Sequence, residues 1–586
     1  MKLSLKKILV VLTLLVTLGI VTGCDGDEKE TLIVNVGPNP TTIDPALNST
    51  VDGATMIIHA FTGLIGYQQN AEGTLVLVPE LAKELPTPTT LENGKIQYVF
   101  TLKEGLKWSN GSTLDAHDFE YAWKRAASAS LGADYNYMFD VIDGYGTNNK
   151  DDLNVKASED GKTLTVVLNS NVPYFFELLA FPTYMPVNKD VVEKAPDKWA
   201  TKVKTYIGNG PYRMVKWAQD SKIVFEKNPH YHNADAINIP RIEFALSDDD
   251  SAILANYKNG TYKLIDAIPN DEIENLKKDY PNEFVIAGQL GTYYINFNIN
   301  DDTIYGDIAT TEVERAKVRK ALSLLIDRNH IATNIGQAGQ MPANSFVPIG
   351  LTEADGKTEF TSKNGVNGDG KGYFSVASAQ YQANCEEAVN LLKEVGYSYN
   401  ESTKKFTNFP SFEYITNPGT GHEAIASYLK ALYEGYGITM TIKTQEWGVF
   451  TETRKDGGYM LARNGWLADY NDPISFLDMW TSESGNNDVQ FGKGDHASQA
   501  IYGETGDKTW AQTYDIIIQQ IKVSSNPIER FTLMHQAEDL LMETGAIVPI
   551  YYYTDLYMVS EDLEGFFASP LGYKFFMYAT YDFEKE

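Results

Sequence analysis

Hydrophobic residues follow two different spacings along the chain, and these spacings predict both strands and helices. Alternating or β-branched runs suit a pleated sheet and predict strands. These runs lie at residues 31–37, 96–102, 162–169, 222–228, 293–300, 438–447 and 547–553. Apolar residues three or four positions apart predict amphipathic helices. The helical patterns lie at residues 115–128, 311–335, 383–396, 422–437 and 526–545.

The order of these elements predicts a mixed α/β architecture. Several predicted helices end at a glycine and lead into a strand within a few residues, as alternating helix and strand units do. This alternation is clearest in the C-terminal half, whereas residues 60–200 are richer in strands and turns. The pair Asn110 and Gly111 there predicts a hairpin turn. With 586 residues, the chain is long enough for about three or four domains.

The charge of the chain excludes some classes of partner. It carries 78 acidic against 49 basic residues, a formal net charge of −29, and no long basic run offsets this excess. Such a surface repels the phosphate backbone of nucleic acids and the head groups of anionic lipids. We therefore expect no nucleic-acid binding and no broad electrostatic attachment to a membrane.

The N-terminus has the pattern of a cleaved targeting signal. Three lysines precede an apolar run at 8–21, which is shorter than the ~20 residues of a spanning helix. Small residues then precede Cys24, a pattern that resembles the lipobox of bacterial lipoproteins. An ordinary signal-peptidase site is the alternative. We expect a signal peptide at 1–23, a tether at 24–30, and attachment to the extracytoplasmic face of the cell membrane through a lipid on Cys24.

The sequence offers no clear catalytic or metal-binding pattern. The helix pattern that starts at His422 begins like a zinc-protease helix, but Ala426 stands where the second histidine is required. A glycine-rich loop at 365–372 resembles a phosphate loop but lacks its Ser or Thr. A pair of carboxylates for glycoside hydrolysis stays possible among the many acidic residues. We therefore expect no metal, no cofactor and no enzyme, with a carboxylate-based hydrolase as an alternative.

The segment RNGWLADYNDP, residues 463–473, groups a cation, a tryptophan and two carboxylates. Asp472 stands directly before a proline, the preferred start of a helix, so we assign it a structural role. Asp469 has no such local role. Judged from the residues alone, salt bridges explain Asp469 and Arg463 as well as a ligand does, and core packing explains Trp466.

This segment resembles the ligand-gripping loop of the oligopeptide-binding proteins of ABC importers, the extracytoplasmic solute-binding family 5. Further stretches resemble the same family in the same order along the chain. They are IDPALNST (43–50), LKEGLKWSNGSTLDAHDFEYAWKRA (102–126), GNGPYRMVKW (208–217), EKNPHYHNADAINIPRIEF (226–244), YYINFNI (293–299) and VRKALSLLIDRNHI (318–331). One departure is His232, which stands where the family commonly has Trp.

The resemblance implies a two-lobed fold like that of periplasmic binding proteins, the Venus flytrap arrangement, with an extra mixed α/β domain inserted in lobe I. By this analogy, lobe I comprises 31–50, 206–292 and 550–586. The inserted domain comprises 51–205, and lobe II comprises 293–549.

The resemblance also implies how a ligand is held. Asp469 resembles the carboxylate that takes the α-ammonium of a peptide, and Arg463 resembles an arginine that meets the peptide carboxylate at some ligand lengths. The backbone of 464–467 and of 35–41 would pair with the peptide main chain. Asn39 stands in a segment where some relatives carry an acidic residue. The expected ligand-binding residues are Asp469, Trp466, Arg463, Asn464, Gly465, Leu467 and Asn39.

The function implied is that of a monomeric receptor that captures oligopeptides between its lobes and delivers them to the permease of an ABC transporter. Two alternatives remain open at this point. One is a receptor of the same fold for another solute, such as a dipeptide, a peptide pheromone, nickel or a sugar. The other is the hydrolase.

Overall fold

The computed structural model describes residues 30–585 except 72, 148 and 502–505. The predicted signal peptide and Cys24 lie outside the described residues, and so does the predicted tether apart from Glu30. The largest element is one mixed sheet with the strand order β17-β16-β18-β12-β19-β11-β1-β10-β9-β8, in which β13 also pairs with β19. Within the described part of the chain, no helix is long and apolar enough to cross a bilayer.

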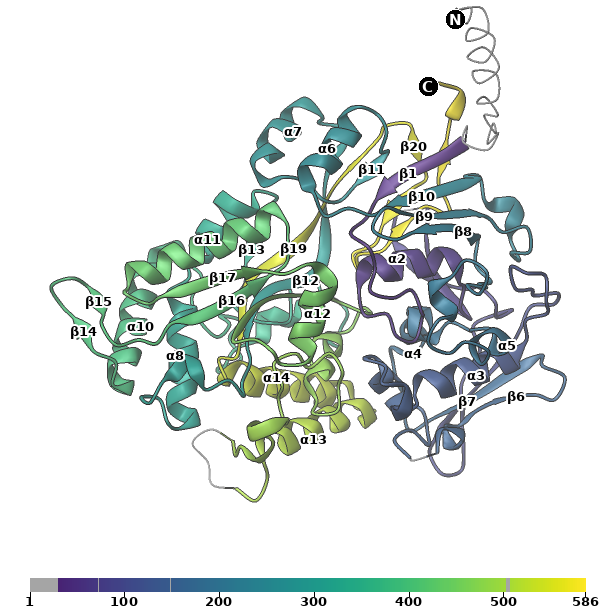
Figure 1. The fold of residues 1–586 in the computed structure, drawn as a ribbon. Helices are drawn as coiled ribbons and strands as arrows, with labels where there is room; N and C mark the ends of the chain where they lie inside the picture. Colours follow the sequence, from purple (N-terminus) through teal and green to yellow (C-terminus); the bar gives the residue numbers. More distant parts are fainter. Residues whose placement is uncertain (1–29, 72, 148, 502–505, 586) are drawn as a thin grey trace, which may run out of the picture.

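Two long antiparallel strands, β12 (Phe284–Phe297) and β19 (Ile547–Val559), connect the two ends of this sheet. The pairing between them is interrupted between Gly288 and Thr292. Helices and short strands gather at each end of the sheet, so that the molecule forms two lobes joined by these strands (Figure 1). The two-lobed α/β fold that the resemblance implied is thereby confirmed.

We use lobe I for the end of the sheet that contains β1. Its strands follow one another in the order given above, with both parallel and antiparallel pairs. The helices α6 and α7 pack beside β11. Its elements are β1 (Thr31–Asn35), α2 (Val51–Ala60), β8 (Tyr212–Ala218), β9 (Lys222–Lys227), β10 (Arg241–Ala245), α6 (Asp250–Lys258), β11 (Leu264–Ile265), α7 (Ile273–Asp279) and the short C-terminal strands β20 (Leu563–Glu564), β21 (Phe567–Ala568), β22 (Lys574–Phe575) and β23 (Thr580–Tyr581).

We use lobe II for the end that contains β16, β17 and β18. Helices surround these strands, as the left-hand side of Figure 1 shows. Its elements are α8 (Glu312–Leu324), α9 (Arg328–His330), β13 (Met341–Pro342), α10 (Tyr381–Val395), β14 (Tyr399–Asn400), β15 (Lys405–Phe406), β16 (Phe412–Thr416), α11 (Thr420–Gly435), β17 (Met440–Thr444), α12 (Trp447–Lys455), β18 (Leu461–Leu467), α13 (Trp510–Val523) and α14 (Pro527–Glu543).

A third group of elements lies between α2 and β8 in the sequence. A sheet of order β4-β5-β7-β6 carries α3 on one side, and β2 and β3 form a hairpin. The group comprises β2 (Ile65–Gln69), β3 (Leu75–Pro79), β4 (Thr89–Thr90), β5 (Ile96–Thr101), α3 (Ala116–Ala126), β6 (Val155–Ala157), β7 (Thr163–Leu168), α4 (Phe175–Ala180) and α5 (Lys189–Val192). We call it the inserted region; the predicted bounds of all three domains stay predictions.

Local sequence explains why α3 starts where it does. Asp115 accepts a hydrogen bond from the His117 backbone at 2.8 Å, and Asp118 accepts one from the Asp115 backbone at 3.1 Å. This reciprocal capping satisfies backbone donors that the first helical turn leaves unpaired. Phe119 and Trp123 then bury one face of the helix, as the apolar spacing predicted.

Several predicted bounds were wrong. The helix predicted at 311–335 is divided, because Asp327 caps a new start by accepting a hydrogen bond from the His330 backbone at 3.0 Å. The strand predicted at 293–300 begins earlier, at Phe284, because pairing with β19 extends it through a stretch without alternating hydrophobicity. The turn predicted at Asn110 and Gly111 is present and brings Lys107 opposite Thr113.

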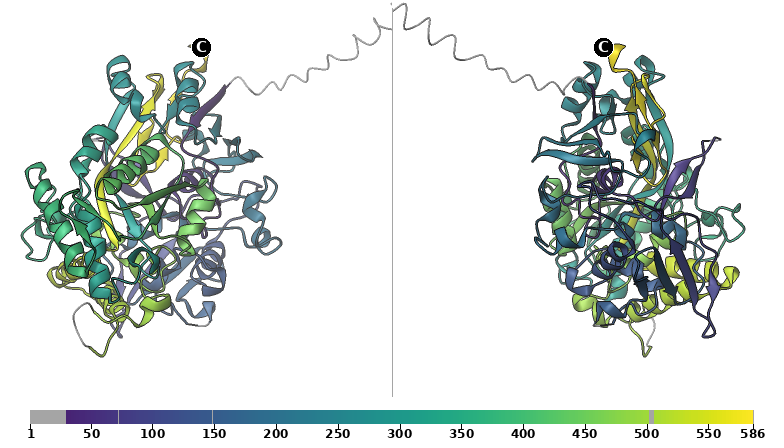
Figure 2. Two further views of the ribbon diagram at one scale, coloured as in Figure 1. Left: turned by 60° about the vertical axis from the view of Figure 1, so that its left-hand side comes forward. Right: turned by 90° about the vertical axis from the view of Figure 1, so that its right-hand side faces the viewer.

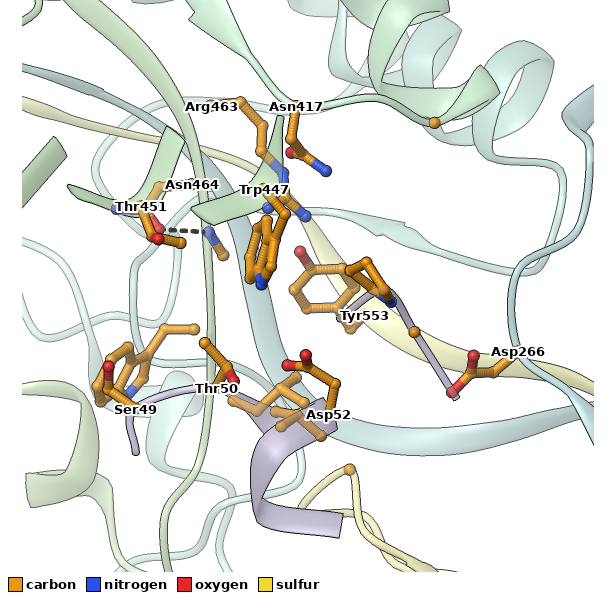
Figure 3. A pocket seen from close by; sticks show the side chains of 18 of the residues that line it. Ser49, Thr50, Asp52, Asp266, Asn417, Trp447, Thr451, Arg463, Asn464 and Tyr553 are labelled. Atoms are coloured by element: carbon orange, nitrogen blue, oxygen red, sulfur yellow. Dashed lines mark hydrogen bonds between the residues drawn. The ribbon is translucent and has the colours of Figure 1, made fainter. Parts of the chain in front are cut away.

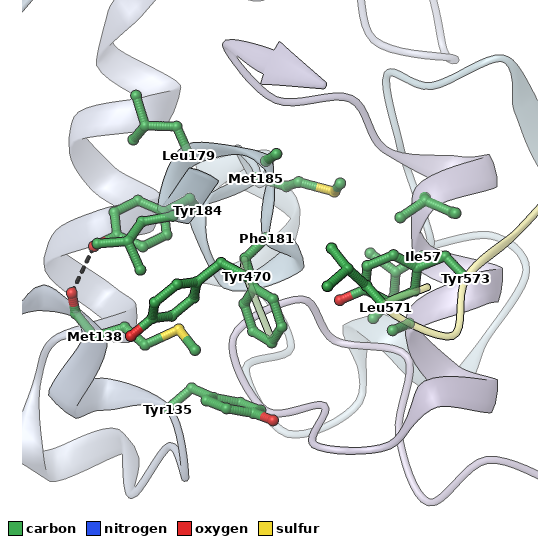
Figure 4. Close-up of a cluster of buried hydrophobic side chains, with 14 of the residues drawn as sticks. Ile57, Tyr135, Met138, Leu179, Phe181, Tyr184, Met185, Tyr470, Leu571 and Tyr573 are labelled. Atoms are coloured by element: carbon green, nitrogen blue, oxygen red, sulfur yellow. Dashed lines mark hydrogen bonds between the residues drawn. The ribbon is translucent and has the colours of Figure 1, made fainter. Parts of the chain in front are cut away.

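A buried aromatic cluster joins the inserted region to both lobes. It contains Ile57 of α2, Tyr470 of lobe II, Leu571 and Tyr573 near the C-terminus and, from the inserted region, Tyr135, Met138, Leu179, Phe181, Tyr184 and Met185 (Figure 4). The Tyr174 and Tyr470 rings stack with centroids 5.0 Å apart. Through Tyr470, the cluster holds the segment that follows β18 and carries Asp469.

Candidate functional site

A cavity of about 840 Å³ lies between the two lobes. Lobe I contributes segments around Val36 and Asp52 to its wall, the inserted region contributes Tyr135, and lobe II contributes β18 and one face of α12. Side chains of lobe I, such as Asp52, and of lobe II, such as Trp447 and Arg463, reach the same space (Figure 3). Figure 2 shows from two further directions that the inserted region, in dark blue, lies beside both lobes.

The strand β18 presents an unpaired edge to this cavity. It pairs along its whole length with β12, from Leu461 opposite Phe297 to Leu467 opposite Gly291. Its other neighbour, β16, pairs only with Leu461 and Ala462. Residues 463–467 therefore lie beside the cavity with one edge free, and a free strand edge can pair with an extended peptide.

Asp469 lies at the end of this wall and has no cationic partner among the described residues. Its side chain is 7% exposed. Tyr135 donates a hydrogen bond to Oδ1 at 2.9 Å, whereas Oδ2 is buried without a hydrogen-bond partner. Burial raises the pKa of Asp469 well above its usual range; the hydrogen bond from Tyr135 opposes this and the nearby charge of Asp478 adds to it. The carboxyl group lines the cavity and lacks the cation that its charged form requires.

Asp472, three residues further on, is fully paired. Both of its oxygens accept hydrogen bonds from Arg530 at 2.8 Å, and it caps the short helix Pro473–Phe476 by accepting a bond from the Ile474 backbone at 3.1 Å. The structural role predicted for Asp472 is confirmed.

Arg463 lies in an aromatic part of the cavity. Its guanidinium carbon lies 5.3 Å from the centre of the Tyr293 ring, a cation–π distance. Among the residues that the structure describes, it forms no ion pair, and its Nε has no hydrogen-bond partner. Burial lowers the pKa of this guanidinium, but the neighbouring hydroxyls, those of Tyr553 and Tyr293 first, outweigh burial and raise it. A ligand anion would find an uncompensated positive charge here.

The other residues of β18 are positioned by short contacts. Asn464 donates to Asp488 at 3.0 Å and accepts from the Gly465 backbone at 2.8 Å. Trp466 donates from Nε1 to the Ser475 carbonyl at 2.8 Å. A side chain at Gly465 would collide with the Tyr553 hydroxyl, which would lie 2.3 Å from its Cβ.

The structure brings together all the predicted ligand residues except Asn39. Arg463, Asn464, Gly465, Trp466, Leu467 and Asp469 line the cavity. Asn39 instead bonds Gln219 at 3.3 Å and Trp217 at 3.4 Å. It does not belong to the lining, although Pro38 and Thr41 do. Whether these residues contact a ligand stays a prediction.

Sequence reasoning missed several cavity residues. Tyr135, which bonds Asp469, lies 334 positions away in the inserted region. Asp52, Asp266 and Tyr553 also line the cavity. No local pattern marks any of them, because only the folded arrangement of lobes brings them to one space.

Hydrogen bonds connect the lobes beside this cavity. Asp250 of lobe I accepts hydrogen bonds from the backbone and hydroxyl of Thr420 at 2.9 and 2.8 Å. Thr420 begins α11, whose own cap residue is a glycine without a side-chain bond. Lys455 of lobe II bonds Ser49 at 3.1 Å and Asp134 of the inserted region at 2.5 Å.

Comparison with known proteins places this geometry in a family. The chain is 30% identical over 572 residues to the oligopeptide-binding protein OppA of Bacillus subtilis, covering 95% of this chain and 94% of that protein. It is 30% identical over 554 residues to the periplasmic oligopeptide-binding protein OppA of Salmonella typhimurium, covering 92% and 90%.

A solved structure agrees over the same extent. The crystal structure of Haemophilus influenzae OppA in complex with RPPGFSPFR matches with a TM-score of 0.78 at 26% identity, covering 95% of this chain and 99% of that one. The model of the bacterial extracellular solute-binding proteins, family 5, matches residues 76–488. This protein belongs to the bacterial extracellular solute-binding proteins, family 5.

Proposed function

We propose that this protein is an extracytoplasmic receptor that captures oligopeptides between its lobes and delivers them to the permease of an ABC transporter. The observation that carries this proposal is the carboxylate of Asp469, buried in the wall of the cavity without a cation. The relatives named as oligopeptide-binding proteins, and the peptide in the H. influenzae complex, support the same ligand class.

The binding mode we propose uses what all peptides share. The α-ammonium of the peptide pairs with Asp469, its main chain adds to the free edge of β18, and its carboxylate approaches Arg463 when its length permits. The strand from 463 to 467 spans about 13 Å at ~3.3 Å per residue, similar to an extended peptide of four or five residues. Main-chain pairing gives affinity without reading side chains.

Ligand entry requires the lobes to separate. We propose that they rotate about the segment Gly288 to Thr292, where the pairing of β12 with β19 is interrupted. Opening would break the bonds of Asp250 to Thr420 and of Lys455 to Asp134. A ligand that bridges both lobes shifts the population toward the closed form.

We further propose that the protein is a monomer, attached to the cell membrane by a lipid on Cys24, and that it acts without catalysis. The sequence pattern before Cys24 and the family membership support this. Replacing Cys24 with serine should release the protein from the membrane fraction into the soluble fraction. Retention of the Cys24→Ser protein in the membrane would contradict lipid anchoring.

The ligand class can be tested without choosing a peptide in advance. Native mass spectrometry of the protein purified from residue 25 onward should show a heterogeneous set of peptide adducts, which disappear after unfolding and refolding. A single adduct of defined mass that is not a peptide would support the alternative, a receptor of the same fold for another solute. Conversion of an added peptide to fragments would support a hydrolase.

A further inference from the structure

A second carboxylate in the cavity, Asp52, also lacks a cationic partner among the described residues. It lies in the first turn of α2 and is 8% exposed. Its Oδ2 is buried without a hydrogen-bond partner, and the residue lines the cavity. The positive end of the helix dipole favours an acidic residue in a first turn. That effect explains the choice of residue type but leaves the buried oxygen unpaired.

A third carboxylate, Asp266, lies on the same lobe I wall just after β11. The cation that acts on it most strongly is Lys574, but Lys574 already bonds both oxygens of Asp555 at 2.8 and 2.7 Å. Burial raises the pKa of Asp266 to about 7; Lys574 opposes this shift, and the negative charges of Asp555 and Asp52 add to it. Asp52 and Asp266 are therefore close enough for the charge of one to act on the other.

Other carboxylates of the cavity are compensated by groups of the protein. Asp488 lies 3.5 Å from Arg454 and accepts a bond from Asn464. Asp134 is paired with Lys455 at 2.5 Å. Asp52 and Asp266 differ because no described residue of the chain forms an ion pair with either. Figure 3 shows both carboxylates directed toward the open space of the cavity, from separate elements of lobe I.

We propose that Asp52 and Asp266 form a side-chain subsite for a cationic residue of the bound peptide, lysine or arginine. This inference rests on the proposed function, because it assigns a ligand preference to the same cavity. A buried carboxylate is stabilised in its charged form by a paired cation with hydrogen-bond donors. A lysine or arginine side chain carries both, and a peptide that lies along β18 occupies the cavity that both carboxylates line.

The test compares two peptides that differ by one charge. Tetra-alanine peptides with a free amine carry either lysine or norleucine at each position in turn, and calorimetry measures their affinity. Wild-type protein should bind the lysine peptide about tenfold or more tightly than its norleucine partner at one position. Asp52→Asn should remove most of that preference while leaving the norleucine affinity unchanged, and Asp266→Asn should reduce the preference by a smaller factor.

A matched control separates a local contact from the general charge of the cavity. Asp248 also lines the cavity from lobe I but is exposed, and Asp248→Asn should keep the lysine preference. If Asp52→Asn lowers the affinity for both peptides equally, Asp52 has a structural role and the subsite is refuted. If Asp52→Asn does not fold, Asp266→Asn decides by the same criterion.

The two proposals fail in different ways. A wild-type protein that binds both peptides equally at every position would overturn the subsite and leave peptide binding intact. A wild-type protein that binds neither peptide, while a positive-control oligopeptide mixture also gives no heat, would overturn the proposed function and the subsite with it.

Discussion

Asp469 and Asp472 are three residues apart and equally buried, at 7% and 8% exposure, but their surroundings differ. Asp472 bonds Arg530 with both oxygens and caps a helix. Asp469 has one hydrogen bond, from Tyr135, and an oxygen without a partner. The charge of Asp472 is therefore compensated within the chain, whereas the charged form of Asp469 would need a cation from outside the chain.

The same contrast separates structural from ligand-facing carboxylates elsewhere. Asp44, in the N-terminal stretch IDPALNST, bonds Arg125 at 3.0 and 2.6 Å and accepts a bond from Trp199 at 2.9 Å. It lies outside the cavity lining. Burial alone therefore does not mark a ligand residue; burial without compensation, beside a cavity, does.

Removing the paired carboxylate should give the largest loss of stability. Asp472→Ala leaves the buried Arg530 without its partner, which typically costs about 3–5 kcal/mol in the free energy of unfolding. Urea denaturation followed by circular dichroism measures this loss. Asp469→Ala is the matched control and should cost clearly less stability in the ligand-free protein, because it removes one hydrogen bond from Tyr135 and no ion pair. Equal losses of stability in the two variants would show that the ion pair of Asp472 with Arg530 does not distinguish it from Asp469.

Peptide binding should release a proton from Asp469. Burial raises the pKa of Asp469 above 3.8 in the free protein, so its contribution to ligand-free stability is present below about pH 4 and is lost as pH rises through the folded-state value. An ammonium ligand requires the charged form. In the window between the ordinary and the raised pKa, affinity should therefore increase with pH, by at most about tenfold per unit.

Calorimetry in two buffers of different ionisation enthalpy measures this proton release. Asp469→Asn is the control, since it cannot release the proton. A number of protons released that is the same for wild-type protein and Asp469→Asn would assign the linkage to another group, such as Asp266 with its pKa of about 7.

The smallest effect on stability and affinity is expected for the hydrogen bond between Trp466 and Ser475. Trp466→Phe removes the hydrogen bond from the indole to the Ser475 carbonyl, which is worth about 0.5–1.5 kcal/mol of unfolding free energy. Affinity for peptides should change by no more than about threefold, because phenylalanine keeps an aromatic ring at this position of the cavity lining and only the bond to Ser475 is lost. A larger loss of affinity than of stability would mean that the ligand needs the part of the indole that phenylalanine lacks.

The sequence predicted the local part of this arrangement. The proline after Asp472 identified a helix cap, but its partner Arg530 lies 58 positions away and no pattern connects the two. Asp469 was assigned through resemblance, since its environment depends on Tyr135 from the inserted region. The length of β12 was underestimated because residues 284–291 do not alternate in hydrophobicity, and its first part, residues 284–288, is held in the sheet by β19.

The central claim is that Asp469 neutralises the terminal amine of a bound peptide. The direct test is a cycle in which wild-type protein and Asp469→Asn each bind one peptide with a free amine and the same peptide with an acetylated amine. Acetylation should weaken binding to wild-type protein by ~30-fold or more, as expected for loss of a buried charge partner, and should change binding to Asp469→Asn by about threefold or less. Equal losses on acetylation in both proteins would contradict the claim.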